Sequence, residues 1–495
     1  MVAILPGTAE RAQAYGMLAV TNADEIAAIL FIDIAVIVVA ARLAAAVSRR
    51  LGQPAVIGEI VAGILLGPSL LGAFPGQLTT TLFPIEVRPF LKVVAQLGLI
   101  LFMFIVGLEL DPGLLRKQRR AAALISLSSI ALPFALGIAL AVAIHPSHDV
   151  VRGRTVAFWP FALFIGASMS ITAFPVLARI LADRGMFHTR IGALALACAA
   201  IDDVMAWSLL AVVVAVIAST GVGDLPRILI LSLLFVAAMH LVVKPVLDHV
   251  VAGRYRQAKR LTPDILAIVL AGVLASSYVT AWIGIHQIFG AFIFGTAMPR
   301  EATHGLLGEI VERLESVTVL LLLPVFFVVT GLEADVRSMG TRGIGELGLI
   351  LLVACVGKFV GASLAARFQR LTGRQAMTIG ILMNTRGLTE LVILNVGLAF
   401  GVLDRDLFTM LVIMALVTTV MATPLLRVVY PDRVLVQDRV REDEVAIGPR
   451  RGRRVLIAVG DPTHAHRMAE IAVDLLVDDR PAELVLTRFT PRTQE

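Results

Sequence analysis

The stretch AAIDDVMAW (199–207) places two adjacent aspartates, Asp202 and Asp203, in the middle of a long apolar segment. That segment runs from Ile191 to Ala218 and is long enough to cross a bilayer as a helix. An ionised carboxylate at that depth costs at least about 2.5 kcal/mol, and two neighbouring carboxylates also repel each other. We therefore expect a cation, a proton or a fixed positive charge to compensate the pair. The alternative is a buried ion pair that serves only folding, but acidic residues inside a membrane are generally functional.

The composition of the chain is that of a polytopic membrane protein. Of its 495 residues, 58% are hydrophobic and 16% are charged, whereas soluble proteins carry roughly a quarter charged residues. The net charge of +6 is explained by basic loops, so we expect no nucleic-acid partner. Both cysteines, Cys198 and Cys355, lie in apolar segments, which excludes a disulfide framework.

Thirteen apolar runs of spanning length predict an all-α membrane domain at residues 25–430, after an extracytoplasmic segment at 1–24. The first run holds Asp33 and Arg42, so we expect a retained helix and not a cleaved signal peptide. The predicted helices lie at 25–48, 54–72, 90–109, 119–145, 157–183, 188–219, 225–249, 262–281, 284–299, 308–332, 344–368, 374–401 and 405–430.

The connecting segments alternate in charge, which predicts the orientation of the chain. Basic residues gather on one side at Arg49/Arg50, Arg116/Lys117/Arg119/Arg120, Arg179/Arg184/Arg190, Arg254/Arg256/Lys259/Arg260, Arg300/Arg313 and Arg367/Arg370/Arg374. The other side carries only scattered cations. The positive-inside rule then places the N-terminus outside and the C-terminus in the cytoplasm of a multi-pass protein of the inner cell membrane.

An internal repeat supports this topology. The third predicted helix ends in VGLELDP (106–112) and the tenth in TGLEADV (330–336). With thirteen helices these ends fall on opposite sides of the membrane, so the two copies are inverted relative to each other. Transporters commonly place a substrate site where two inverted repeats meet.

Two predicted helices contain polar interruptions at mid-membrane depth. SMSITAFPVLARIL (168–181) contains Pro175, which cannot donate a backbone hydrogen bond, and Ser170 and Thr172, which can satisfy freed backbone groups or ligate a cation. MNTRGLTEL (383–391) is the counterpart in the other half, and its polar residues are Asn384, Thr385, Arg386 and Glu390. The pair predicts crossed, broken helices around an ion site, although an ordinary proline kink is the simpler interpretation of the first.

The stretch VGKFVGA (356–362) places Lys358 too deep in its helix to reach either interface. It needs a carboxylate, a carbonyl or a lowered pKa, and the aspartate pair is the natural partner. Gly357 and Gly361 would let a neighbouring helix approach closely. Glu59, His286 and Asp33 are also polar residues within apolar runs, but we leave these three out of the predicted site.

The composition changes at residue 431. Residues 431–454 are a polar, arginine-rich cytoplasmic linker that can touch anionic lipid. Segments 453–460, 465–477 and 482–489 then predict a strand, a helix and a strand. One such unit cannot cover a sheet on both faces, so residues 431–495 are expected to be the linker and the start of a larger α/β domain. Gly460 alone is weak evidence for nucleotide binding.

Four segments resemble the monovalent cation/proton antiporter superfamily, specifically its second family, which includes bacterial antiporters, ligand-gated potassium efflux systems and plant cation/proton exchangers. They are PAVIGEIVAGILLGPSLLG (54–72), SITAFPVLARIL (170–181), GIHQIFGAFIFGTAMP (284–299) and NTRGLTELVILN (384–395). The resemblance covers about residues 25–430, and the tail is similar, less specifically, to the beginning of a universal-stress-protein-like domain.

The resemblance implies a homodimer of thirteen-helix protomers. Its first three and eighth to tenth helices would form a dimerisation scaffold, and the fourth to sixth and eleventh to thirteenth an elevator-like core. Carried onto this chain, Asp203 matches the acid that alternately binds cation and proton, Asp202 the position before it and Lys358 the basic residue paired there. Thr172 lies in one helix break, and Arg386 with Glu390 in the other. The residue before the key acid and the tail both depart from the potassium-efflux branch.

The residues and the resemblance converge on secondary active antiport of Na+ or K+ against protons, without a cofactor and without enzymatic chemistry. The cation would bind Asp203 and Thr172, and exchange would be electrogenic if Asp202 and Lys358 release a second proton. A ligand-gated potassium efflux system or a cation channel of the same fold is the alternative. An intramembrane aspartyl protease is excluded because residues i and i+1 point about 100° apart on a helix.

Overall fold

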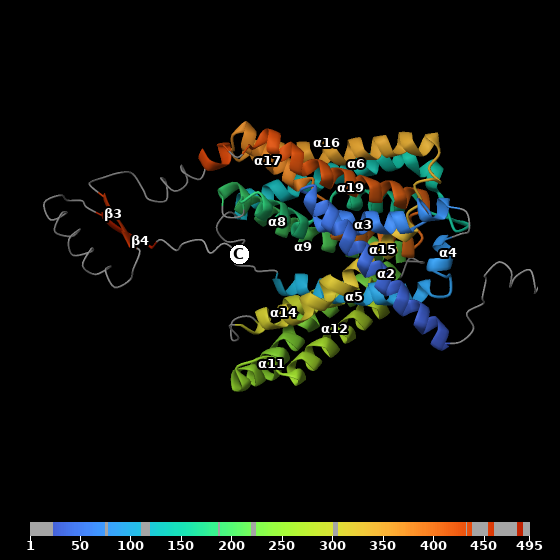
Figure 1. Cartoon of the computed structure of the whole chain (residues 1–495), viewed down its shortest axis with the longest axis horizontal. Coiled ribbons are helices and arrows are strands. Elements are labelled where there is room, and N and C mark those ends of the chain that lie inside the picture. Colours follow the sequence, from blue (N-terminus) through green and yellow to red (C-terminus); the bar gives the residue numbers. More distant parts are fainter. Residues whose placement is uncertain are drawn as a thin grey trace, which may run out of the picture. The chain divides into compact units, whose positions relative to one another are not determined.

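The computed structural model describes residues 23–74, 78–109, 119–186, 189–218, 224–299, 305–431, 433–437, 454–459 and 483–488. The chain divides into two compact units, Met1–Pro431 and Asp432–Glu495 (Figure 1). In the second unit, β3 (Arg454–Val459) and β4 (Glu483–Arg488) pair in parallel, at the two predicted strand positions. The helix expected at 465–477, most of the linker and nearly all of segment 1–24 lie outside the described residues.

Eleven helices in the described part of the chain are long and apolar enough to cross a membrane, and a bent helix pair raises the number to twelve. These twelve correspond to twelve of the thirteen predicted segments. The exception is 284–299, where the helix α13 covers only Ile288–Ala297. Ten residues of helix rise about 15 Å, half of the hydrocarbon thickness. The preceding helix ends at Ile283, and its C-cap Gly284 has a left-handed φ of +105°. Pro299 lies two residues after the end of α13. Length alone therefore does not support a count of thirteen.

The helices of the first unit form two groups, each packed mainly within itself. The first bundle contains α2 (Ala23–Arg50), α3 (Ala55–Leu66), α5 (Arg88–Glu109), α12 (Pro263–Ile283), α13 and the consecutive α14 (Leu306–Val317), η3 (Thr318–Leu322) and α15 (Leu323–Glu333). The second bundle contains α6 (Arg119–His148), α7 (Phe158–Met169), α8 (Phe174–Asp183), α9 (Arg190–Ala218), α16 (Thr341–Phe368), α17 (Gly373–Met383), α18 (Leu388–Ala399) and α19 (Arg405–Val429). Figure 1 shows α6, α16 and α17 together, away from α5, α12 and α14.

The remaining elements are one further candidate span, Pro226–Ala258, and short segments within each bundle. The segment α10 (Asp224–Ala238), η2 (Met239–Val243) and α11 (Lys244–Ala258) leads from α9 to α12 and packs against α12 and α13. The turn η1 (Leu71–Ala73) and α4 (Leu78–Leu82) follow α3, and a small hairpin of β1 (Val150–Val151) and β2 (Arg154–Thr155) follows α6.

The two copies of the repeated motif make equivalent contacts. A Cβ added to Gly107, in the first copy, would lie 3.1 Å from the Cα of Gly295 in α13. A Cβ added to Gly331, in the second copy, would lie 2.6 Å from the Cα of Gly63 in α3. The close approach of backbones at each copy therefore requires glycine. Lys92, near the start of α5, pairs with Glu333 at the end of α15, so these packed helices are antiparallel and the motifs lie at opposite ends.

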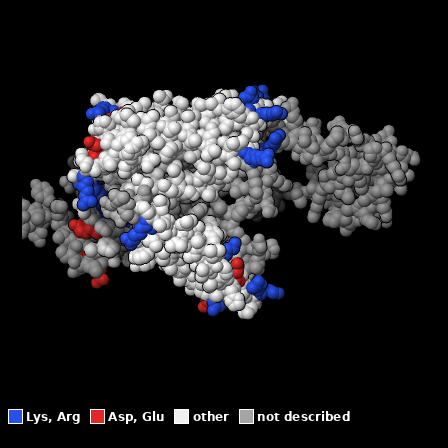
Figure 2. Space-filling model, turned by 180° about the vertical axis from the view of Figure 1, so that it is seen from behind, with Lys and Arg blue, Asp and Glu red and all other residues white. Residues whose placement is uncertain are grey.

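The surface of the first unit matches a bilayer. Figure 2 shows the charged side chains gathered toward the two ends of the described part, with a wide uncharged band between them. Large apolar side chains of α2 are also exposed, including Phe31, Val39 and Leu43, which are 68%, 59% and 65% exposed. A contiguous apolar surface of this kind is stable against lipid or another protein but not against water.

Candidate functional site

Two broken helices cross in the middle of the second bundle. The first breaks between α7 and α8, at residues 170–173, and the second between α17 and α18, at residues 384–387, where the two halves are bent by 42°. The breaks are joined directly. The Ala173 N–H donates to the Thr385 carbonyl at 3.0 Å, and the Thr172 hydroxyl lies 2.9 Å from the Met383 carbonyl. The interruption at Pro175 is therefore a full break and not an ordinary kink.

Local sequence explains both breaks. Pro175 lies in the first turn of α8, where its missing N–H costs nothing, but it prevents α7 from continuing. Gly387 permits the close crossing, because a Cβ there would lie 2.5 Å from Val176 Cγ2. The hydroxyls of Ser170 and Thr385 donate to the Gly166 and Leu382 carbonyls, so these two side chains satisfy helix ends.

The acid pair lies at the centre of α9, beside this crossing. Asp202 is fully buried, and its Oδ2 lies 3.1 Å from Lys358 Nζ and 2.8 Å from the Thr172 hydroxyl. Lys358 is also fully buried, and its Nζ lies 2.7 Å from the Thr172 hydroxyl and 3.1 Å from that of Ser129. Lys358 thus pairs with Asp202, as its depth in the sequence suggests. Of the two adjacent aspartates, it is therefore Asp202 that Thr172 contacts.

Asp203 has a different environment. It is 4% exposed, and the backbone amide of Phe174, at the N-terminus of α8, is its hydrogen-bond partner. Its Oδ1 has no hydrogen-bond partner among the described residues. Asp203 also lines a cavity of about 10 Å³, together with Pro175, Trp207 and Leu388. That volume is close to what one water molecule needs, so the side chain of Asp203 borders a space of the size of a single small ligand.

A second buried ion pair, Arg386–Glu390, connects the second helix break to the end of α7. Arg386 Nη1 lies 2.8 Å from Glu390 Oε2, and the guanidinium also donates to the Ser168 and Met169 carbonyls at 2.7 Å each. The Ser168 hydroxyl donates to Glu390 Oε1 at 2.6 Å. Arg386 therefore caps the C-terminus of α7, and Glu390 lies in the first turn of α18, where a negative charge is favourable. Both interactions stabilise the break electrostatically.

The remaining predicted site residue, Asn384, lies at the end of α17 and contacts Cys355 at 3.7 Å. The sequence analysis missed two residues. Ser129 contacts both Asp202 and Lys358 from α6. Thr419, on α19, accepts from the Arg386 N–H at 2.9 Å and lies 2.7 Å from the Arg386 carbonyl, so it holds the unwound segment. Ser129 is one of three serines, with Ser126 and Ser128, in a largely apolar run, so nothing in the sequence singled it out.

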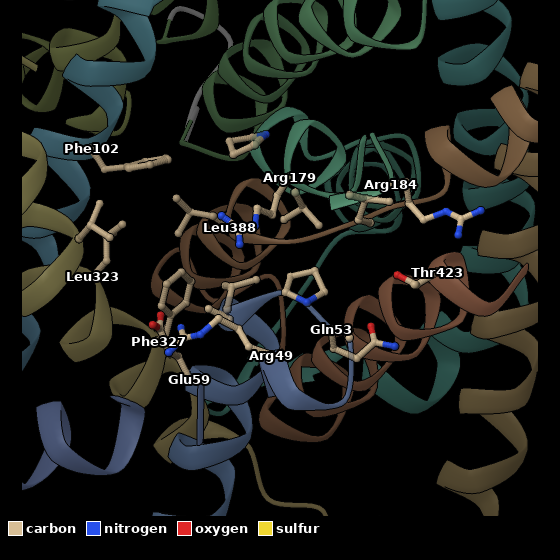
Figure 3. Close-up of a pocket in the computed structure, with 18 of the residues that line it drawn as sticks. Arg49, Gln53, Glu59, Phe102, Arg179, Arg184, Leu323, Phe327, Leu388 and Thr423 are labelled. Atoms are coloured by element: carbon tan, nitrogen blue, oxygen red, sulfur yellow. The ribbon is translucent and has the colours of Figure 1, made fainter. Parts of the chain in front are cut away.

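A large cavity lies between the two bundles (Figure 3). This funnel has a volume of about 570 Å³ and shares Phe102, Pro175 and Leu388 with the small cavity at Asp203. Its lining includes Arg49 and Arg427, so we call its mouth the arginine-rich end. The funnel is lined from both bundles, which places it on the boundary between them.

The opposite end of the same boundary is more closed. A cavity of about 180 Å³ lies there and shares no lining residue with the funnel. Hydrogen bonds cross between the bundles around it: Asn395 Nδ2 donates to the Thr330 hydroxyl at 2.9 Å, and the Asp335 N–H to the Thr409 hydroxyl at 3.0 Å. Arg405 lies 3.4 Å from Glu333. Asp203 is thus approached from the arginine-rich end.

The three polar residues that the sequence analysis left out occupy other places. Glu59 lines the funnel and His286 lines the cavity at the opposite end. Asp33 is buried on α2, and neither of its carboxylate oxygens has a hydrogen-bond partner in the part of the chain that the structure describes. None of the three lines the small cavity at Asp203.

Comparisons with known proteins agree on one family. The family model described as "Sodium/hydrogen exchanger, transmembrane" matches residues 36–429. The chain is 41% identical over 405 residues to the Na(+)/H(+) antiporter NhaS4 of Synechocystis, covering 81% of this chain and 97% of that protein. It is 41% identical over 407 residues to Cation/H(+) antiporter 17 of Arabidopsis thaliana, and 37% identical over 388 residues to K(+)/H(+) antiporter 1 of Saccharomyces cerevisiae.

The chain covers 48% of that plant relative and 44% of that yeast relative, about half of their length. Among solved structures, the sodium proton antiporter MjNhaP1 from Methanocaldococcus jannaschii matches 83% of this chain and 99% of its own, with a TM-score of 0.58 and 14% identity. At that identity the match shows the fold. The named relatives are transporters and not enzymes.

Proposed function

Because the chain belongs to the sodium/hydrogen exchanger family, whose matched members are membrane antiporters, we propose that it exchanges Na+ or K+ for protons, with cation and proton competing at Asp203. One observation carries this proposal. Asp203 is a buried carboxylate with one oxygen that has no hydrogen-bond partner among the described residues, and its side chain lines a small cavity that adjoins the funnel on the bundle boundary.

The chemistry of the site suits this exchange. Alkali cations prefer hard oxygen ligands, and a carboxylate that loses its cation in a buried site favours a proton. Binding of one therefore excludes the other, and the two fluxes are coupled without covalent chemistry. The Phe174 amide occupies one side of Asp203, so the cation would bind the carboxylate oxygen that has no hydrogen-bond partner among the described residues.

The Asp202–Lys358 pair supplies the second step of the proposal. A cation entering beside Asp203 repels Lys358, which would then release its proton as its pair with Asp202 breaks. Exchange would move net charge, and each elementary charge moved is worth about 2.3 kcal/mol per 100 mV. Thr172 bridges Lys358 and Asp202, so it links the state of this pair to the helix crossing.

The two bundles suggest how access alternates. We propose that the first bundle is the dimerisation scaffold of a homodimer and that the second moves against it as an elevator-like core. The funnel at the arginine-rich end and the hydrogen bonds at the opposite end support a conformation open at one side. We also propose that the arginine-rich end faces the cytoplasm of an inner cell membrane, by the positive-inside rule. A channel would need a continuous path, whereas the two cavities share no lining residue.

The test is a fluorescence assay of the pH gradient in everted vesicles, with sodium, lithium, potassium and rubidium added in turn. We expect the parent to dissipate the gradient with at least one of these cations and Asp203→Asn to show only the background rate. Asp264→Asn is the matched control, because Asp264 is an exposed acid at the start of α12. Exchange by Asp203→Asn at the parental rate would refute the proposal.

A further inference from the structure

The funnel that leads to the cation site is lined by positive charge. Four arginines line it, Arg49, Arg179, Arg184 and Arg427, against a single carboxylate, Glu59, which lies beside Arg49 (Figure 3). The positive-inside rule accounts for arginines in loops but not for four of them around one cavity between two bundles. Such a cluster repels the cation that the site would bind, and it attracts anions.

The same cavity has an apolar wall. Phe102 from α5, Val319 from η3, and Leu323 and Phe327 from α15 line it on the side of the first bundle. Figure 3 shows Phe102, Leu323 and Phe327 across the cavity from Arg184 and Thr423. Val319 is also 37% exposed, so this part of the apolar wall is accessible to a ligand. A volume of about 570 Å³ lies within the roughly 300–1,000 Å³ that ligand pockets have.

A cationic rim with an apolar wall matches an amphipathic anion. Guanidinium groups bind phosphate with paired, charge-assisted hydrogen bonds, which an ammonium group does not offer in the same geometry. Some of the arginine contacts are internal, since Arg184 donates to the Tyr430 carbonyl at 2.9 Å. Arg427 lies at the loop that joins α2 and α3, where a Cβ on Gly52 would be 3.4 Å from its Nη2. Arg49, in the last turn of α2, and Arg427 therefore line neighbouring parts of the funnel.

We propose that the funnel binds a phosphate-bearing anion, and that an anionic phospholipid occupies it with its headgroup at Arg49 and Arg427 and an acyl chain along the apolar wall. The effect on exchange rests on the proposed function. A ligand wedged between the bundles at this end binds only the conformation in which the funnel is open. Anionic lipid therefore slows exchange by holding the funnel open.

Binding is measured on the full-length protein in an uncharged detergent, without any ion gradient. The probes are palmitoyl-oleoyl phosphatidylglycerol, phosphatidylcholine with the same chains, and inorganic phosphate, and the readout is the shift in melting temperature. We expect phosphatidylglycerol to raise the melting temperature and the other two probes to leave it unchanged. The variant Arg49→Gln/Arg427→Gln should need about tenfold more phosphatidylglycerol per arginine removed.

The control is Arg50→Gln/Arg374→Gln, which removes the same charge from exposed positions that do not line the funnel. It should respond like the parent. A second variant, Val319→Trp, fills the apolar wall without touching an arginine and should also lose the response. Exchange in proteoliposomes should be slower with phosphatidylglycerol than with phosphatidylcholine alone, and less so in Arg49→Gln/Arg427→Gln.

Equal shifts with phosphatidylglycerol and phosphatidylcholine would overturn the proposal, as would an unchanged response of Arg49→Gln/Arg427→Gln. An equal, arginine-dependent shift with inorganic phosphate alone would overturn the assignment of a lipid. The binding assay is repeated on Asp203→Asn, in which exchange is expected to be absent. A lipid response in Asp203→Asn would support lipid binding whether or not the proposed exchange at Asp203 is correct.

Discussion

Two ion pairs are buried at the helix crossing, and they differ in how completely their polar atoms are used. All four side chains of Asp202–Lys358 and Arg386–Glu390 are fully inaccessible. Both Glu390 oxygens accept hydrogen bonds, and only Nε of the Arg386 guanidinium lacks a partner within the described residues. In the Asp202–Lys358 pair, Oδ1 of Asp202 has no hydrogen-bond partner within the described residues, and neither has Oδ1 of the adjacent Asp203.

We interpret Arg386–Glu390 as a structural pair and Asp202–Lys358 as part of the proposed exchange. Breaking a satisfied buried pair leaves a buried charge without compensation, so such a pair stabilises one arrangement. An unsatisfied carboxylate oxygen in the same environment is destabilising unless a cation or a proton binds it. The crossing therefore combines an ion pair whose carboxylate is fully hydrogen-bonded, Arg386–Glu390, with a group of charges, Asp202, Asp203 and Lys358, whose carboxylates are only partly hydrogen-bonded.

The comparison is wrong if the Arg386–Glu390 pair can be broken without lowering the free energy of unfolding. We expect Arg386→Gln to lower the free energy of unfolding by about 3–5 kcal/mol, because Glu390 and the end of α7 lose their buried partner. The melting temperature and the yield of monodisperse protein measure this. Arg386→Gln/Glu390→Gln should recover part of the loss, since no buried charge is then uncompensated. A single variant that melts like the parent would show that the pair is not structural.

The Asp202–Lys358 pair should respond in the opposite way. We expect Asp202→Asn/Lys358→Gln to change the free energy of unfolding by about 1 kcal/mol or less, because replacing both members of a buried pair is often neutral. Exchange should continue but carry no current, which is measured in proteoliposomes by current and pH gradient together. Lys358→Gln alone leaves Asp202 uncompensated and should be the less stable variant. A current of parental size in the double variant contradicts the second-proton step.

A third cluster, at the end of α6, sharpens the comparison with Asp404, which lies just before the membrane-spanning helix α19. His148 contacts Asp404, which caps α19 through the Leu407 N–H, and also Glu346 on α16. Burial acts to raise the pKa of Asp404, but the hydrogen bonds from His148 and the backbone outweigh it and hold this pKa below its ordinary value.

The folded-state pKa of Asp404 is therefore lower than that of the unfolded chain, about 3.9. Its contribution to stability is complete above that pH and is lost as the pH falls through the folded-state pKa. We expect Asp404→Asn, which keeps the cap, to cost about 1 kcal/mol or less at neutral pH. Melting curves of parent and variant should converge below about pH 4. A gap that stays constant down to pH 3 would assign the effect to packing.

The sequence identified the residues whose depth alone makes them unusual. Asp202, Asp203 and Lys358 stand out because a charge in a spanning segment is costly wherever the helix packs. The two breaks stand out because proline and glycine act on the local backbone. Ser129 and Thr419 do not stand out, because a serine or threonine hydroxyl can donate to the carbonyl of its own helix, so its partner depends on which helix lies opposite.

Close packing decided those partners. A Cβ on Gly357 would lie 2.9 Å from Pro133 of α6, and one on Gly361 would lie 2.7 Å from the Ser128 carbonyl. These glycines bring α16 against α6 and thereby set Lys358 beside Ser129. The sequence suggested the close approach but not the helix that makes it. The length of α13 was also misjudged, because apolar composition does not show where a helix ends.

The sequence by itself determined that this protein spans a membrane, that charges lie at mid-depth and that two helices break, since hydropathy and backbone chemistry are properties of short segments. Only the tertiary structure decided which carboxylate pairs with Lys358, which carboxylate lines a small cavity and which end of the bundle boundary holds the large funnel. Those features depend on distances between helices far apart in the chain, and such distances are fixed by packing and not by local composition.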